Sequence, residues 1–294
     1  MTLKLDALLD DKPATVGNVP DGFDALIVGD LARALAGRRH DAAGVVHIAR
    51  DGQRLAAVER SLAFMAPDVE RLVLPGWDCQ PYDRVSPNAA IIAQRTTTLA
   101  RLAVSRGGEK PRVVLTTVNA ALQRVATPQN VARQSFSAAP GNVVDLKQLT
   151  EWLEINGFMR SSTVRDYGEY AVRGGIVDLF PAGHAEPIRL DFFGDTLECI
   201  RPFDPGTQRS TGQLRALDLV PMSEVQLTSD TIRRFRQSYA ATFGAPNRDD
   251  QLYAAVSEGR RYPGMEHWLP LFHDGLATLF DHLPDARYVL DPLA

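Results

Sequence analysis

Short apolar runs alternate with amphipathic stretches between residues 20 and 130. Four of the runs have the length and composition of buried strands: Asp24–Val28, Gly44–Ala49, Arg71–Leu74 and Arg112–Thr116. Two of the stretches between them have helical spacing: Asp51–Met65 and Ala89–Ala103. In the first of these, Leu55, Val58 and Leu62 recur every three or four residues. Strands and helices that alternate in this way predict an α/β domain with a doubly wound parallel sheet, which we place at residues 1–133.

The pattern changes between residues 134 and 221, where a single helix precedes several strands. The helix is predicted over Leu146–Asn156, with Gly157 as the glycine that ends it. Four strands are predicted after it: Glu169–Arg173, Gly175–Phe180, Pro187–Phe193 and Thr196–Phe203. The pair Gly194-Asp195 between the last two strands fits a two-residue hairpin turn. This region is therefore predicted to be a small α+β domain with an antiparallel sheet.

Residues 222–294 return to a helical pattern and form the third predicted region. Helices are expected over Thr231–Phe243 and Asp249–Glu258, followed by an aromatic core around Trp268. The chain ends directly after one more predicted strand, Arg287–Leu290, so we expect this third domain to be truncated and the chain to be part of a longer protein.

Composition and charge restrict the classes of function. Of the 294 residues, 45% are hydrophobic and 23% charged, as in ordinary globular proteins. No apolar run approaches the ~20 residues that cross a bilayer, and Met1–Asp11 lacks the apolar core of a signal peptide. The cytoplasm is therefore the expected compartment, with no membrane partner. A net charge of −4 predicts weak or no direct DNA binding.

Motifs for nucleotide, metal or catalytic chemistry are missing from the sequence. Gly29 follows a predicted strand, but the sequence VGDLARALAG lacks the lysine and hydroxyl of GxxxxGK[ST]. The six histidines are scattered, and Cys79 and Cys199 have no CxxC spacing. We therefore predict no catalytic residue, no cofactor and no metal site.

Three segments of the α+β region, together with an aromatic- and proline-rich loop at Leu74–Pro87, carry a family resemblance. These segments are Tyr167–Pro181 (YGEYAVRGGIVDLFP), Pro187–Asp195 (PIRLDFFGD) and Ile200–Ser210 (IRPFDPGTQRS). They resemble the UvrB-homology module that the excision-repair protein UvrB shares with the bacterial transcription-repair coupling factors (Mfd). UvrB has a P-loop and a tyrosine-rich hairpin, and this sequence has neither. The chain is therefore more similar to the N-terminal module of the coupling factors, over about residues 20–290.

The resemblance implies a non-catalytic module whose first domain is P-loop-like without a nucleotide site, whereas the whole family protein is an ATP-dependent DNA translocase. It implies two partners, UvrA and the C-terminal domains of the parent protein. The UvrA-binding residues of the family correspond by motif to Arg173 in AVRGG, and to Arg189 and Phe193 in IRLDFF. The expected function is to recruit UvrA, and with it nucleotide excision repair, to stalled RNA polymerase. The alternative is a UvrB-type DNA-binding or nucleotide-hydrolysing module.

Strand periodicity, independently of the resemblance, places Arg189 and Phe193 together on one exposed face of a strand. In a strand with a period of two, Ile188, Leu190 and Phe192 share one face and form its natural core side. Arg189 and Phe193 then share the opposite face, and an exposed aromatic beside an arginine has the composition of an interface hot spot. In the competing interpretation, Phe193 is buried and Arg189 only pairs with Asp191 or Asp195. The Leu74–Pro87 loop, which contains Trp77, is interpreted as mainly structural, holding the first domain together. The alternative is a role in contacting other domains.

Overall fold

The computed structural model describes residues 6–10, 12–36, 44–81, 83–104, 110–247 and 249–292. Most of Met1–Asp11, which is predicted not to be a signal peptide, lies outside these residues. The chain divides into two compact units. Unit 1 comprises Met1–Gly76, Arg101–Arg124 and Ala277–Ala294, and unit 2 comprises Trp77–Ala100 and Val125–Leu276. Among the described residues, no helix is both long and apolar enough to span a bilayer.

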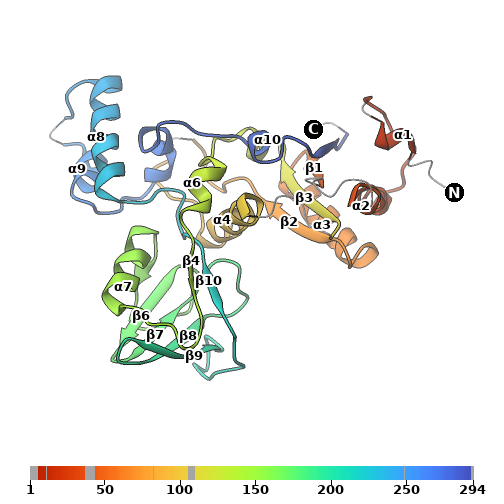
Figure 1. Ribbon diagram of the computed structural model, residues 1–294. Coiled ribbons are helices and arrows are strands. Elements are labelled where there is room, and N and C mark those ends of the chain that lie inside the picture. Colours follow the sequence, from red (N-terminus) through yellow and green to blue (C-terminus); the bar gives the residue numbers. More distant parts are fainter. Residues whose placement is uncertain are drawn as a thin grey trace. The chain divides into compact units, whose positions relative to one another are not determined.

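A four-stranded parallel sheet forms the centre of unit 1 (Figure 1). Its spatial order is β11 (Arg287–Leu290), β1 (Val45–Ala49), β3 (Arg112–Thr117) and β2 (Glu70–Leu74). The two central strands, β1 and β3, are buried at every position, as is usual for the inner strands of parallel sheets, and their sequences are therefore largely apolar. Strand β1 has a parallel neighbour on each side, β3 and β11. The prediction of an α/β fold with a parallel sheet is confirmed.

Two helices cover one face of this sheet, α2 (Phe23–Ala36) and α3 (Gly52–Met65). Their apolar stripes pack against alternate residues of β1 and β3, such as Val45 and Leu115. Asp51 caps α3, because its carboxylate accepts a hydrogen bond from the Arg54 amide at 2.8 Å. The remaining helices of unit 1 are short: α1 (Asp6–Leu9), α5 (Val118–Leu122) and α10 (Leu279–His282).

The predicted strand at Asp24–Val28 is wrong, since these residues lie inside helix α2. The run of four apolar residues is compatible with a strand or a helix, and packing decides between them. Val28, Leu31 and Ala32 are buried at helical spacing against α3. Gly29 is therefore a mid-helix residue, and an added Cβ would lie 2.9 Å from the Cβ of Ala66. Its role is close helix packing, and it does not lie in a loop after a strand.

Unit 2 contains a five-stranded sheet whose strands follow chain order, from β5 to β9. The strands are β5 (Met159–Arg160), β6 (Glu169–Arg173), β7 (Ile176–Leu179), β8 (Ile188–Phe193) and β9 (Thr196–Pro202). All neighbours are antiparallel except β5 and β6. Helix α7 (Leu146–Ile155) packs on one face through Leu149 and Leu153. The predicted antiparallel sheet and its single helix are thus present.

The rest of unit 2 is largely helical. It consists of the strand pair β4 (Phe136–Ala138) and β10 (Leu217–Leu219), helices α6 (Pro128–Ala132), α8 (Ser229–Phe243) and α9 (Gln251–Ser257), and the 3₁₀ helix η1 (Met265–Leu271). Helix α4 (Ala89–Val104) contributes residues to both units. The rings of Phe235 and Phe272 stack with their centroids 4.8 Å apart. They lie in the apolar core formed by α8, α9 and η1, and Trp268 packs against this core. The predicted aromatic core around Trp268 is therefore confirmed.

We expect Gly157→Ala to destabilise unit 2 strongly. Gly157 follows helix α7 with φ +95°, and an added Cβ would lie 2.6 Å from the Cβ of Ser223. A left-handed alanine costs about 1–2 kcal/mol, and forced overlap in a packed site adds about 1–3 kcal/mol. Gly141 is the matched control, because it has φ +91° with nothing within 4 Å of the added Cβ. Urea unfolding should show a clearly larger loss for Gly157→Ala, and equal losses would contradict the close approach to Ser223.

Candidate functional site

The two faces of the sheet in unit 2 have different compositions. One face carries apolar side chains that are buried under α7, among them Val177, Ile188, Leu190 and Ile200. The opposite face, called here the outer face, carries charged residues and an exposed phenylalanine. Period-two alternation along the antiparallel strands produces this separation. The assignment of Leu190 to the core is confirmed, with 1% of its surface exposed.

A tight hairpin and a β-bulge shape the end of strands β8 and β9. Phe193 pairs with Thr196, which leaves Gly194-Asp195 as the predicted two-residue turn, and Gly194 has φ +60°. The pairing then shifts, because Phe192 pairs with Leu197 but Asp191 pairs with Cys199. One additional residue in β9, Glu198, is thus accommodated as a bulge. The bulge allows Leu197 and Ile200 to be buried together although they are three residues apart.

Two rows of residues cross the outer face. Strand register places Arg173, Ile176, Asp191 and Cys199 side by side in the first row. The second row contains Ala171, Asp178, Arg189 and Arg201. Phe193 follows Asp191 on the same face of β8, next to the turn at Gly174-Gly175, whose Gly175 carbonyl accepts a hydrogen bond from the Phe192 amide at 2.7 Å. The three residues predicted from the family motif therefore lie on one surface.

Asp178 is the centre of this surface, with only 1% of its area exposed. The Arg189 guanidinium donates to both of its carboxylate oxygens, from Nε at 2.7 Å and from Nη2 at 2.9 Å. Hydrogen bonding to Asp178 raises the pKa of Arg189, so this side chain stays charged. The guanidinium also lies 4.8 Å from the ring centroid of Phe203, within cation–π range. Arg173 approaches the same carboxylate, with Nη1 at 3.9 Å from Oδ2.

The expectation that Arg189 pairs only with Asp191 or Asp195 is wrong. Asp191 binds Arg201 instead and accepts a hydrogen bond from the Cys199 thiol at 2.8 Å. The sequence analysis did not identify Asp178, although Asp178 stands directly opposite Arg189 once the register of β7 and β8 is known. The sequence feature that could have indicated Asp178 is a charged residue among the apolar residues of Ile176–Leu179.

Phe193 is the most exposed large side chain of this face, at 77% of its surface. The interpretation in which it is buried is therefore wrong. Ile176 is 37% exposed in the adjacent row, and the side chain of Arg173 is 50% exposed. The exposed face thus offers an aromatic ring, an aliphatic side chain and guanidinium groups to a partner. We call Arg173, Ile176, Arg189 and Phe193 the arginine–phenylalanine face.

The Trp77 loop is fixed within unit 2 by a buried network. Trp77 Nε1 donates to Glu224 Oε1 at 3.2 Å, and the fully buried Arg95 donates to the same oxygen at 2.5 Å. The loop is also held through Ser86, which donates to Glu266 at 2.7 Å. Tyr82 lies outside the described residues. These contacts agree with a structural role for the loop, but the hydrogen bonds of Trp77 and Ser86 join it to residues of the third predicted region, 222–294, and not to the rest of the first predicted domain.

The sequence of this region is similar to that of a known protein family. Residues 136–225, which include the whole arginine–phenylalanine face, match the family of the UvrB interaction domain. This match covers the five-stranded sheet of unit 2, from β5 to β9, and helix α7.

Longer relatives extend the similarity beyond this domain. The chain is 34% identical over 277 residues to the transcription-repair-coupling factor of Haemophilus influenzae, which covers 94% of the chain and 23% of that protein. The corresponding protein of Escherichia coli is 31% identical over 92% of the chain, and that of Myxococcus xanthus 37% identical over 85%. The chain spans 23% and 22% of the lengths of those two proteins. It is therefore homologous to one segment of the transcription-repair-coupling factors, which confirms the resemblance.

We expect Leu190→Ala to lower the stability of the fold strongly and Phe193→Ala to leave it almost unchanged. Leu190 is buried, so its truncation should cost about 2–5 kcal/mol of unfolding free energy. Phe193 is exposed, so its truncation should change stability by less than about 0.5 kcal/mol. Urea denaturation of both variants tests the assignment of the two faces. A destabilised Phe193→Ala together with an unchanged Leu190→Ala would reverse that assignment.

Proposed function

We propose that this chain is a non-catalytic interaction module that binds UvrA through the arginine–phenylalanine face and so connects a transcription-repair coupling protein to nucleotide excision repair. The observation that carries the proposal is the exposed Phe193, which projects beside two arginines from the outer face of a UvrB interaction domain. The coupling role itself is suggested by the names of the relatives, of which this chain spans about a quarter or less.

Several physical features of the face suit it for recognition. Binding energy at protein interfaces concentrates in a few aromatic and arginine residues. Arg189 is already held by Asp178 and Phe203, so little side-chain entropy is lost when a partner binds. Arg173 is half exposed, and its guanidinium donates to the Ser162 carbonyl while its accessible side remains open to an acidic group. A suitable partner therefore offers an apolar pocket for Phe193 flanked by carboxylates.

The alternative, a UvrB-type nucleotide-hydrolysing module, is less well supported. Phosphate sites of P-loop proteins use the N-terminus of the helix that follows a buried strand. Here strand β1 leads to α3, whose N-terminus is capped by the Asp51 carboxylate. A carboxylate at this position competes with a phosphate for the same amide groups and repels it electrostatically. The segment Arg50–Arg54 also lacks the glycine–lysine pair of a P-loop.

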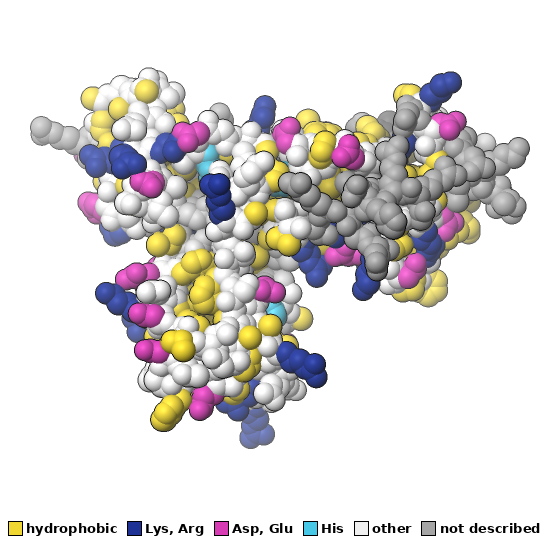
Figure 2. Space-filling model, viewed as in Figure 1, with side chains coloured by type: hydrophobic (Ala, Val, Ile, Leu, Met, Phe, Trp, Pro, Cys, Tyr) yellow, Lys and Arg dark blue, Asp and Glu magenta, His cyan; other side chains and the backbone are white. Residues whose placement is uncertain are grey.

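Direct DNA binding is also less well supported than protein binding. The net charge of the chain is −4. On the side visible in Figure 2, the Lys and Arg side chains of the described residues are interspersed with Asp and Glu and form no continuous basic patch. A duplex requires several cations aligned with its phosphates.

We expect Phe193→Ala to weaken UvrA binding by about 30-fold or more, because loss of an interface anchor typically costs about 2 kcal/mol. Arg173→Ala should act in the same direction. Arg189→Ala should also weaken binding, but it leaves the buried Asp178 without its bidentate partner, so its unfolding must be measured alongside. Titration of each variant with purified UvrA gives the comparison.

Phe64→Ala is the matched control for this titration. Phe64 lies on helix α3 in unit 1 and is 86% exposed, so the variant removes an equally exposed ring from another surface. Its UvrA affinity should equal that of the wild type. Retained affinity in Phe193→Ala, or an equal loss in Phe64→Ala, would refute binding through the arginine–phenylalanine face.

Calorimetric titration with Mg-ATP should show no binding, since Asp51 occupies the helix terminus that a phosphate would need. A mobility shift with duplex DNA at about 150 mM salt should likewise show no submicromolar complex. Micromolar ATP affinity would instead favour the nucleotide-hydrolysing alternative.

A further inference from the structure

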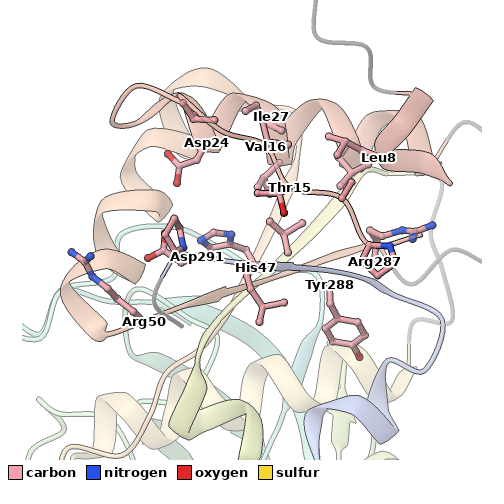
Figure 3. A pocket seen from close by; sticks show the side chains of 18 of the residues that line it. Leu8, Thr15, Val16, Asp24, Ile27, His47, Arg50, Arg287, Tyr288 and Asp291 are labelled. Atoms are coloured by element: carbon pink, nitrogen blue, oxygen red, sulfur yellow. The ribbon is translucent and has the colours of Figure 1, made fainter. Parts of the chain in front are cut away.

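A second group of chemically reactive side chains lies in unit 1, away from the arginine–phenylalanine face. Asp24 belongs to α2, His47 to β1, and Asp291 directly follows β11. Parallel pairing of β11 with β1 brings the last two together, and the Asp291 amide donates to the Ile48 carbonyl at 2.9 Å. Figure 3 shows the Asp24, His47 and Asp291 side chains pointing toward one another at the wall of a pocket. One donor atom from each lies within 4.8 Å of the other two.

Arg54 of helix α3 organises the two carboxylates. Its Nη2 donates to Asp24 Oδ2 at 2.6 Å, and its Nε donates to Asp291 Oδ1 at 3.2 Å. The other oxygen of each carboxylate is buried and has no hydrogen-bond partner among the described residues. Arg54 therefore fixes both acids while leaving one oxygen of each available.

The His47 imidazole is similarly prepared to act as a ligand. Only 2% of the residue is exposed, and neither ring nitrogen has a hydrogen-bond partner within the described part of the chain. A buried polar group without a partner costs about 1–3 kcal/mol, so three such groups at one point require a physical reason.

We propose that Asp24, His47 and Asp291 bind a divalent transition-metal ion, of which Zn²⁺ is the best fit. One imidazole nitrogen with two carboxylate oxygens suits Zn²⁺, whereas Ca²⁺ and Mg²⁺ favour oxygen ligands alone. Three protein ligands leave a fourth position, which faces an open cavity of about 850 Å³ lined by residues such as Thr15, Arg50 and Tyr288. Arg54 is an outer-shell residue that orients both carboxylates.

The proposed ion connects three elements that are distant in the sequence. It would join helix α2 and the segment after β11 to the central strand β1. The ion would also neutralise the close approach of the part-buried Asp24 carboxylate and the buried Asp291 carboxylate, which one guanidinium offsets only in part. Its expected consequence is therefore a higher thermal stability of unit 1 in the presence of the metal.

Equilibrium dialysis of the full chain against Zn²⁺, followed by elemental analysis and thermal unfolding, tests the site. The wild type should retain one ion per chain and unfold at a higher temperature with Zn²⁺. Asp24→Asn, His47→Gln and Asp291→Asn should each weaken binding by more than about 100-fold, since loss of an outer-shell partner alone costs about 10–100-fold. The two asparagine variants preserve side-chain shape, so they decide the outcome if His47→Gln fails to fold.

His273→Gln is the matched control, because His273 also has a buried ring nitrogen with no hydrogen-bond partner among the described residues but lies in unit 2. It should bind Zn²⁺ as the wild type does. A wild-type chain that retains no ion would overturn the proposal, as would folded Asp24→Asn and Asp291→Asn variants that bind with undiminished affinity.

Discussion

The pairing of strands β7 and β8 places a buried carboxylate, Asp178, directly opposite Arg189, and the outer face is organised around this ion pair. Asp178 is nearly inaccessible to water, so its charge has to be met by a cation in fixed geometry. The bidentate contact with Arg189 satisfies both oxygens and determines where the guanidinium points. A slip of one residue between the strands would turn Arg189 into the apolar core, so the pair also opposes wrong register. The desolvation of both charges offsets much of the attraction in such a pair, but removal of one partner leaves an uncompensated buried charge.

Much of the architecture could be predicted from local patterns. The α+β region was predictable because apolar and polar residues alternate along Ile188–Phe193 and Gly194-Asp195 marks a tight turn. The face on which Phe193 lies therefore followed from the two-residue period of the strand. Helix α2 was missed because four consecutive apolar residues do not distinguish a strand from a helix, and only its packing against α3 decides the question. Asp178 was missed because its role depends on pairing between strands, which no local pattern contains.

The group of Asp24, His47 and Asp291 lies beyond prediction from sequence for a stronger reason. The three residues are far apart along the chain and share no motif, so only the return of β11 to the edge of the sheet brings them together. The histidine also interrupts an otherwise apolar strand, which is easily interpreted as an isolated core residue. Proposed ligands of this kind become visible only when the topology is known.

The contact between Cys199 and Asp191 has a consequence for the redox chemistry of the outer face. Burial and the hydrogen bond to the Asp191 carboxylate raise the pKa of the Cys199 thiol, so it remains protonated at neutral pH. Peroxides and alkylating agents react with the thiolate and only slowly with the thiol. Agents of this kind also damage DNA, and Cys199 stands in the same row as Arg173 and Ile176. The Cys199 thiol, in the row that also contains Arg173 and Ile176, should therefore react slowly with these agents.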